Sequence, residues 1–255
     1  MTDRFAVVGA GQMGNGIAHV CATSGFDVTM IDVSADALAK AKATIEKNLD
    51  RQVKKGALDE AAKQAAMARI HTATTLDAVQ GATVVVEAAT ERKDLKLQIF
   101  RDLDRLADAG AILATNTSSI SITEIAAVTT RPESVIGMHF MNPVPVMQLV
   151  EVIRGLATSD AVNARTVELS KALGKVPVEA NDFPGFIANR ILMPMINEAC
   201  YAVMEGVGTP EAVDQVMKLG MNHPMGPLTL ADFIGLDTCV AILEVLHEGL
   251  GDPKY

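Results

Sequence analysis

Cysteine is scarce in this sequence, positive charge is outnumbered by negative charge, and long apolar runs are absent. No apolar run reaches the roughly 18 residues that a membrane-spanning helix needs. The chain has three cysteines, none at a metal-ligand or C-x-x-C spacing, so we expect neither a disulfide framework nor a thiolate metal site. Apolar, helical surroundings favour packing in the core for all three: Cys21, Cys200 and Cys239.

The charge balance is acidic, with 22 Lys and Arg residues against 31 Asp and Glu residues and a formal net charge of −9. Such a chain is a poor partner for nucleic acid, because nucleic-acid recognition requires a positive field. An anionic ligand must therefore be held by local features such as helix N-termini or a few basic side chains. The first apolar run starts at residue 4, which leaves no room for a signal peptide and predicts a cytoplasmic protein.

From residue 4 to about residue 180, short apolar runs alternate with helical patterns. This alternation is typical of an α/β protein with a doubly wound, mostly parallel sheet that carries helices on both faces. Strands are predicted at residues 4–9, 27–32, 82–88, 111–115, 134–140, 149–153 and 175–179. Helices are predicted at residues 15–25, 35–55, 58–69, 93–107 and 159–173.

The pattern changes at residues 181–185 (NDFPG), where proline and glycine mark a natural boundary. Only helical patterns follow, at residues 186–204, 210–219 and 228–250. Pro194 lies inside the first of these helices, and we expect a kink there. The sequence therefore predicts two domains, a sheet domain at residues 1–182 and a smaller all-helical domain at residues 183–255.

A glycine-rich loop follows the first predicted strand: Gly9, Ala10, Gly11, Gln12, Met13 and Gly14. Gly9 permits the tight turn, Gly11 lets a pyrophosphate approach the backbone, and Gly14 lets the next helix pack closely. Asp32 ends the second strand, where a carboxylate binds ribose hydroxyls and repels a 2′-phosphate. This context predicts a dinucleotide site that prefers NAD to NADP, and a glycine turn without a ligand is the alternative.

Glu151 lies mid-strand in LVEVI, and a charged side chain in such an apolar strand requires a partner. His139 lies near the end of the preceding strand pattern, SVIGMHF. If the two strands are neighbours, Glu151 can fix the tautomer of His139 and stabilise its imidazolium, which prepares a general base for alcohol oxidation. A purely structural His–Glu pair is the alternative.

Small polar residues at positions 116–119 (NTSS) follow another strand, at the end that faces the ligand crevice in a doubly wound sheet. Ser118 is therefore a candidate to bind a substrate oxygen or the nicotinamide, although a turn that caps the next helix is the alternative. Asn189 begins the first helix after the boundary, where a second domain would close over the crevice. Its amide can donate to a substrate carbonyl, or it can be an ordinary polar residue of a first helical turn.

One face of the long helix at residues 35–55 carries four basic residues at helical spacing: Lys47, Arg51, Lys54 and Lys55. In an acidic protein this stripe is suited to phosphate groups. A solvated helix face with ion pairs between successive turns is the alternative. We assign no chemistry to His19, His71 and His247, and no metal site is predicted.

Six motifs in this order resemble the short-chain 3-hydroxyacyl-CoA dehydrogenase family, and within it the bacterial enzymes that act on 3-hydroxybutyryl-CoA. They are GAGQMG, NTSS, HFMNPVPVM, LVEV, DFPGFIANR and HPMGPLTLAD. The resemblance spans nearly the whole chain and implies a Rossmann-type sheet domain that binds NAD. It also implies a homodimer formed largely through the helical domain.

The resemblance implies roles for residues that match the family's motifs. His139 is similar to the catalytic base and Glu151 to its partner, while Ser118 and Asn189 resemble the residues that hold the substrate's 3-oxygen. Further positions match residues that line the NAD site or contact CoA: Glu91, Lys96 and Asn142 for NAD, and Lys55 and Asn48 for CoA. The implied reaction interconverts (S)-3-hydroxyacyl-CoA and 3-ketoacyl-CoA, including acetoacetyl-CoA.

Two other functions stay open from the residues alone. One is a related dehydrogenase of a free hydroxy acid or sugar acid, and the other is a non-catalytic NAD-binding protein. Family members also continue past the last helix with a glycine-rich, basic segment, whereas this sequence stops at Tyr255. We therefore expect a truncation that affects the completeness of the NAD site and of the dimer surface.

Overall fold

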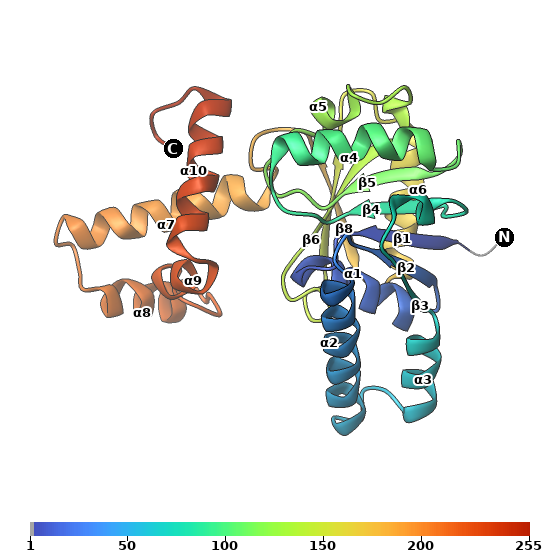
Figure 1. The fold of residues 1–255 in the computed structure, drawn as a ribbon. Helices are drawn as coiled ribbons and strands as arrows, with labels where there is room; N and C mark the ends of the chain where they lie inside the picture. Colours follow the sequence, from blue (N-terminus) through green and yellow to red (C-terminus); the bar gives the residue numbers. More distant parts are fainter. Residues whose placement is uncertain (1–2) are drawn as a thin grey trace. The chain divides into compact units, whose positions relative to one another are not determined.

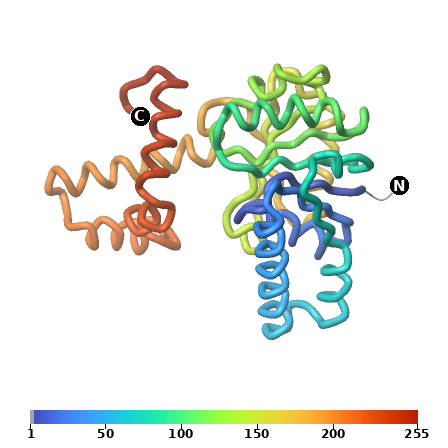
Figure 2. Tube along the Cα trace, in the orientation of Figure 1, coloured from blue at the N-terminus to red at the C-terminus, as the bar shows by residue number. Residues whose placement is uncertain are grey.

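The computed structural model describes residues 3–255 (Figure 1). The chain divides into two compact units, and the boundary in the sequence lies between Asp182 and Phe183. The trace in Figure 2 passes only once from the first unit to the second, so each unit is built from one continuous segment.

The first unit is built on one eight-stranded sheet, which belongs to the predicted α/β class with a mostly parallel sheet. Its strands are β1 (Arg4–Val8), β2 (Asp27–Ile31), β3 (Ile70–Ala73), β4 (Val84–Glu87), β5 (Ile112–Thr115), β6 (Val135–Phe140), β7 (Leu149–Arg154) and β8 (Val176–Asn181). Their spatial order is β3-β2-β1-β4-β5-β6-β7-β8. The strands β1 to β6 run parallel, and β7 and β8 run against them. The strand order reverses between β1 and β4, the point where doubly wound sheets bind their ligands.

Helices cover both faces of this sheet. They are α1 (Gln12–Thr23), α2 (Ala35–Lys54), α3 (Glu60–Ala68), α4 (Lys93–Leu106), α5 (Ile122–Ala126) and α6 (Asp160–Ala172), with the short 3₁₀ turns η1 (Leu76–Val79) and η2 (Pro132–Ser134). Figure 1 shows α1 and α2 on one face and α4 and α5 on the other. Because both faces are covered, the central strands are buried on both sides and read in the sequence as continuous apolar runs.

Side-chain alternation divides each central strand between the two faces. In β4, Val84 and Val86 belong to the apolar cluster that also contains residues of α1, α2 and α6. Val85 and Glu87 must then point to the opposite face, which α4 and α5 cover. The same period places Thr115, His139 and Glu151 on the α4 face, because their neighbours along the strands belong to the apolar cluster.

Two elements of the first unit differ from the sequence-based prediction. The strand β3 was not predicted, because its four residues lie at the sheet edge and only Ile70 is buried. Helix α1 begins at Gln12 rather than at residue 15, because Gly11 already serves as its N-cap. The glycine loop is therefore shorter, and its second half forms the first helical turn.

The second unit contains only helices, as predicted: α7 (Ala188–Met204), α8 (Pro210–Gly220), α9 (Pro227–Ile234) and α10 (Leu236–Leu250). The single helix predicted at residues 228–250 is two helices, because Gly235 adopts a φ of 100° that ends α9. Helix α7 continues through Pro194. The prediction that all cysteines are buried was wrong for Cys200, which is exposed on α7, whereas Cys239 packs in the core of this unit.

None of the helices within residues 3–255 has the length and apolar character required to span a bilayer.

The carboxylate of Asp182 holds the N-terminus of α5, the helix that follows residues 116–119. It accepts hydrogen bonds from Ser121 Oγ at 2.7 Å, from Ile122 N at 3.0 Å and from Thr123 N at 2.7 Å. These three donors would otherwise be left without acceptors at the helix start. The last residue of the first unit therefore supports a segment next to the predicted site.

We expect Asp182→Ala to lower the free energy of unfolding by about 1–2 kcal/mol, as other lost caps do. At this chain length the thermal midpoint should fall by about 2–8 °C. Asp160→Ala is the control, since Asp160 forms an exposed ion pair with Arg154 and such pairs contribute little. Equal midpoints for the two variants would contradict the capping role of Asp182.

Candidate active site

The glycine loop links the end of β1 to the N-terminus of α1. Gly9 has a φ of 106°, and a Cβ there would lie 2.6 Å from the carbonyl oxygen of Ala88. A Cβ at Gly14 would lie 1.8 Å from the carbonyl oxygen of Gly9. At Gly11, by contrast, an added Cβ would meet no atom within 4 Å. The loop therefore leaves open space at the helix N-terminus, where backbone amides and the helix dipole favour a diphosphate.

Asp32 follows β2 and lies beside this loop. Its carboxylate accepts a hydrogen bond from Ala10 N at 2.8 Å and another from Ser34 N at 2.9 Å. The carboxylate thus connects the glycine loop to the start of α2 and lies at the carboxyl end of its strand, as predicted for a ribose contact.

Gln12 and Asn142, both predicted at the cofactor site, are brought together from distant parts of the sequence. Gln12 Nε2 donates a hydrogen bond to Asn142 Oδ1 at 3.1 Å. Met13, from the same loop, is instead half-buried against the apolar core. The segment after β6 also packs on α1, because a Cβ at Gly16 would lie 2.8 Å from the Cβ of Val144.

Lys175 supports this same segment and was missed by the sequence analysis. Its buried ammonium donates to the carbonyl oxygens of Val144 at 2.5 Å and Met147 at 2.8 Å. Burial lowers the pKa of the Lys175 ammonium. Lysine at the start of a predicted strand gave no signal of this role, because the contact joins two segments that are distant in sequence.

His139 and Glu151 face each other across the antiparallel strands β6 and β7, where they are direct register partners. The His139 Nδ1 atom lies 2.8 Å from Glu151 Oε2, and both side chains are buried. A carboxylate only accepts hydrogen bonds, so Nδ1 carries the proton and donates it. The contact predicted between the two strands is therefore present, and the Nε2 atom of a neutral imidazole is left as an acceptor.

Ser118 lies on the other side of the imidazole. Its Oγ atom is 3.1 Å from His139 Nε2. With Nδ1 as the donor to Glu151, the Ser118 hydroxyl donates to Nε2. Residues from β6, from β7 and from the turn after β5 thus meet at the carboxyl end of the parallel strands.

Glu91 holds the turn that carries Ser118. Its Oε1 atom accepts hydrogen bonds from the Thr117 hydroxyl, from Ser118 N at 2.9 Å, and from Ser119 N and Oγ at 3.2 and 3.1 Å. Its Oε2 atom lies 3.3 Å from Lys96 Nζ. Burial alone raises the pKa of the Glu91 carboxyl, but the Lys96 ammonium and the hydrogen bonds from the turn outweigh it and hold that pKa below its usual range.

Lys96 does not reach open space. The Lys96 side chain is 1% exposed, and its ammonium lies 2.8 and 2.9 Å from the two carboxylate oxygens of Glu87, which is 0% exposed. Glu87 also accepts from Ala89 N at 2.7 Å and from the Thr115 hydroxyl at 2.7 Å. The sequence analysis missed Glu87, although a charged residue in the apolar strand VVVE is the same signal that singled out Glu151.

The residues predicted to contact CoA or phosphate groups lie at the C-terminal part of α2 and just after it. Lys54, Lys55 and Arg51 are exposed, Asn48 is half-buried, and Arg51 Nη1 donates to Asn48 Oδ1 at 3.2 Å. The stripe is therefore present on the surface of the first unit. Asn189 belongs to the second unit, in the first turn of α7.

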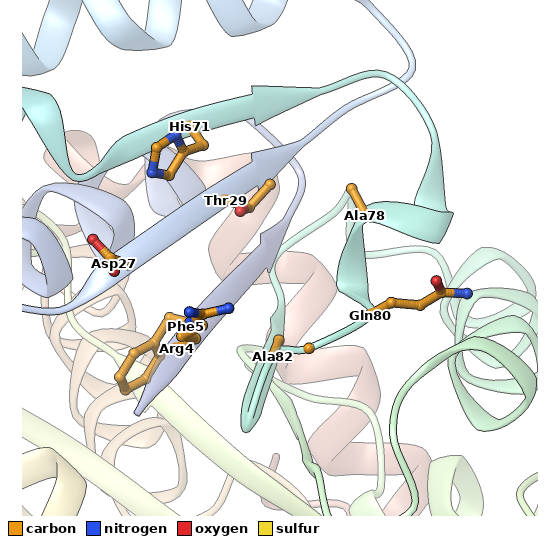
Figure 3. A pocket seen from close by; sticks show the side chains of 9 residues that line it. Arg4, Phe5, Asp27, Thr29, His71, Ala78, Gln80 and Ala82 are labelled. Carbon is orange, nitrogen blue, oxygen red and sulfur yellow. The ribbon is translucent and has the colours of Figure 1, made fainter. Parts of the chain in front are cut away.

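A cavity of about 300 Å³ lies at the opposite edge of the sheet (Figure 3). It is lined by Arg4, Asp27 and His71, which lie in the first two residues of β1, β2 and β3. Because the strands are parallel, their amino ends lie away from the glycine loop. This cavity contains none of the residues predicted to form the site.

Two family descriptions match the chain in succession. The NAD binding domain of 3-hydroxyacyl-CoA dehydrogenase matches residues 4–183, and the C-terminal domain of 3-hydroxyacyl-CoA dehydrogenase matches residues 185–255. The chain therefore belongs to the 3-hydroxyacyl-CoA dehydrogenase family of oxidoreductases. The predicted family and the prediction of NAD as the cofactor are confirmed.

Several relatives match the chain over most of their own length. A probable 3-hydroxybutyryl-CoA dehydrogenase of Bacillus subtilis is 57% identical over 99% of this chain and 88% of its own length. A 3-hydroxybutyryl-CoA dehydrogenase of Bradyrhizobium diazoefficiens is also 57% identical, over 99% of this chain and 86% of its own length. The crystal structure of (S)-3-hydroxybutyryl-CoA dehydrogenase from Ralstonia eutropha matches with a TM-score of 0.98 and 53% identity, covering 100% of this chain and 90% of that one.

Gly11 and Gly14 should respond differently to the same substitution. Gly11→Ala meets no protein atom, so the variant should fold with an unchanged thermal midpoint but bind NADH at least about tenfold more weakly. Gly14→Ala places a methyl group 1.8 Å from the carbonyl oxygen of Gly9 and should lower the thermal midpoint. NADH fluorescence titration and thermal unfolding measure the two effects. Unchanged NADH binding by Gly11→Ala would contradict the placement of the cofactor at this loop.

Proposed function

We propose that the protein catalyses the NAD-dependent oxidation of (S)-3-hydroxybutyryl-CoA to acetoacetyl-CoA and the reverse reduction. The supporting observation is the arrangement of Ser118, His139 and Glu151. The imidazole is hydrogen-bonded through Nδ1 to the Glu151 carboxylate and through Nε2 to the Ser118 hydroxyl. The names of the similar enzymes support this choice of substrate.

In the oxidative direction, His139 Nε2 removes the proton from the 3-hydroxyl group. NAD, which residues 9–14 and Asp32 would hold, would supply the acceptor for the hydride that leaves C3. The O–H and C–H bonds of the substrate break and a carbonyl forms, while the proton stays on the imidazole. Glu151 then faces an imidazolium, whose charge it stabilises across the short Nδ1 contact. Ser118 and Asn189 are proposed to hold the oxygen on which negative charge develops.

In the reductive direction, the His139 imidazolium returns the proton to the oxygen of the 3-keto group. One proton is consumed for each ketone reduced, so low pH favours reduction and high pH favours oxidation. Glu151 orients the ring in both directions, because its carboxylate keeps Nδ1 protonated and leaves Nε2 to exchange the proton.

The remaining predicted residues are assigned to ligand binding. Residues 9–14 and Asp32 are proposed to bind the diphosphate and ribose of NAD, and Glu91 and Asn142 to line its nicotinamide end. Lys96 is proposed to act there through Glu91, since its ammonium is enclosed by protein oxygens. Three residues of the basic stripe, Arg51, Lys54 and Lys55, are proposed to contact the phosphates of CoA, and the neighbouring Asn48 is proposed as a further contact of CoA.

We propose that the first unit binds NAD and carries the groups named above, and that the second unit adds a substrate contact through Asn189 and forms the dimer. Large apolar side chains are exposed on α7, on α8 and between them, including Met204, Val207 and Leu219. Helix α8 has no buried residue at all, although its sequence is amphipathic. Exposed apolar groups of this extent are typical of an interface between subunits, so a homodimer formed through this unit is proposed.

His139→Gln should lower kcat for the reduction of acetoacetyl-CoA by about 10²- to 10⁴-fold, the usual contribution of a positioned acid–base group. NADH binding should stay within a factor of about 3, because His139 lies on β6 and not in the glycine loop. Steady-state rates and NADH titration measure the two effects. Turnover close to that of the unmodified protein would remove His139 from the proposed role.

Activity with acetoacetyl-CoA should exceed activity with free acetoacetate by at least about tenfold in kcat/KM, if the basic stripe on α2 binds the CoA phosphates. Replacing Lys54 and Lys55 together by Met should raise KM for acetoacetyl-CoA and leave the rate with acetoacetate unchanged. NADH consumption at equal substrate concentrations measures both. Equal use of the two substrates would instead favour a dehydrogenase of free hydroxy acids.

A further inference from the structure

A network of charged and polar groups crosses the carboxyl ends of β4, β5, β6 and β7 on the α4 face of the sheet. It begins at the buried pair Glu87–Lys96, continues through Glu91 to the Ser118 turn, and reaches His139. Every contact in it joins oppositely charged groups or a hydrogen-bond donor to an acceptor. The proposed acid–base group is thus connected to a structural ion pair inside the protein.

Glu91 links the two halves of this network, because its two carboxylate oxygens contact different partners. Oε1 accepts from the hydroxyl of Thr117 and from the backbone of Ser118 and Ser119, while Oε2 faces the Lys96 ammonium. Ser118 donates its own hydroxyl on the other side to the imidazole. The carboxylate therefore determines where the backbone that carries Ser118 lies relative to His139.

We propose that Glu91, held by Lys96, is a positioning residue for proton transfer, because it fixes Ser118 against His139. This role rests on the proposed function and extends it, since Glu91 otherwise figures only as a contact of the cofactor. The side chain of Glu91 is 39% exposed, so a cofactor contact and the hold on the turn are compatible. A cofactor contact alone would control KM for NADH, whereas the positioning role would control kcat.

Glutamine cannot replace glutamate here, although it has the same shape. With its oxygen toward the turn, its NH₂ group would face the ammonium of Lys96, and two donors would meet. With its oxygen toward Lys96, its NH₂ group would face the N–H groups of the turn. The first orientation sets two donor groups against each other, and the second leaves the N–H groups of the turn without an acceptor; both remove the charge that pairs with Lys96, so the hold on the Ser118 turn weakens.

Thr117→Val provides a second, milder variant. Thr117 is fully buried, donates its hydroxyl to Glu91, and accepts the N–H of Ile120 at 3.0 Å. The hydroxyl also accepts the N–H of Ser119 at 3.4 Å. Valine has a similar shape and removes these three hydrogen bonds while leaving the charge of Glu91 unchanged. A cofactor contact made by Glu91 would therefore persist in this variant, whereas the hold on the turn would loosen.

The test is a double-mutant cycle between Glu91→Gln and Ser118→Ala, with kcat for acetoacetyl-CoA reduction measured at saturating NADH. Glu91→Gln alone should lower kcat by about tenfold or more, and Thr117→Val by about threefold or more. In the Ser118→Ala background, Glu91→Gln should lower kcat by less than about threefold, because the group that it positions is already gone. Glu124→Gln is the control, since Glu124 forms an exposed pair with Lys93 at 2.8 Å, and it should leave kcat unchanged.

Two results would overturn the positioning role. One is a Glu91→Gln variant with raised KM for NADH and unchanged kcat, which would make Glu91 a cofactor contact alone. The other is a cycle in which the two effects multiply, which would show that Glu91 and Ser118 act independently. If Glu91→Gln does not fold, Thr117→Val decides alone: a kcat equal to that of the unmodified protein rejects the proposal. Failure of the proposed function looks different, because Ser118→Ala would then leave acetoacetyl-CoA reduction unchanged.

Discussion

A carboxylate buried inside a sheet must have a partner, and the arrangement of the site follows from how Glu151 acquires one. Glu151 is 1% exposed in β7, where an unpaired charge would be strongly destabilising. The antiparallel register of β6 and β7 places His139 directly opposite. A slip of one residue would turn the imidazole to the other face of the sheet and leave the carboxylate without it. The strand register that avoids an unpaired buried charge is therefore also the register that forms the acid–base pair.

The rest of the site is on the same face of the sheet for the same geometric reason. Side chains alternate along each strand, so an apolar face toward α1 and α6 leaves the opposite face for Glu87, Thr115, His139 and Glu151. On that face, α4 supplies Lys96 as the counter-charge of Glu87. The charges that the sheet buries are thereby paired, and the end of the network that reaches Ser118 and His139 is available for chemistry.

Much of this could be predicted from the sequence, because the relevant signals are local. Strand periodicity, the glycine loop and the charge within LVEVI gave the fold class and the contact between His139 and Glu151. The hold of Glu91 on the turn could not be predicted, since it depends on backbone N–H groups whose direction follows from the folded turn. The edge strand β3 and the exposure of Cys200 likewise depend on tertiary neighbours that no short window contains.

The central claim is that one imidazole, oriented by Glu151 and contacted by Ser118, exchanges the proton of the substrate's 3-oxygen. A crystal structure of the protein with NAD and acetoacetyl-CoA tests it most directly. The account predicts the 3-keto oxygen within about 2.6–3.2 Å of His139 Nε2 and in hydrogen-bond contact with Ser118 Oγ. A substrate bound with that oxygen against another side chain, and with His139 Nε2 turned away from it, would contradict the account.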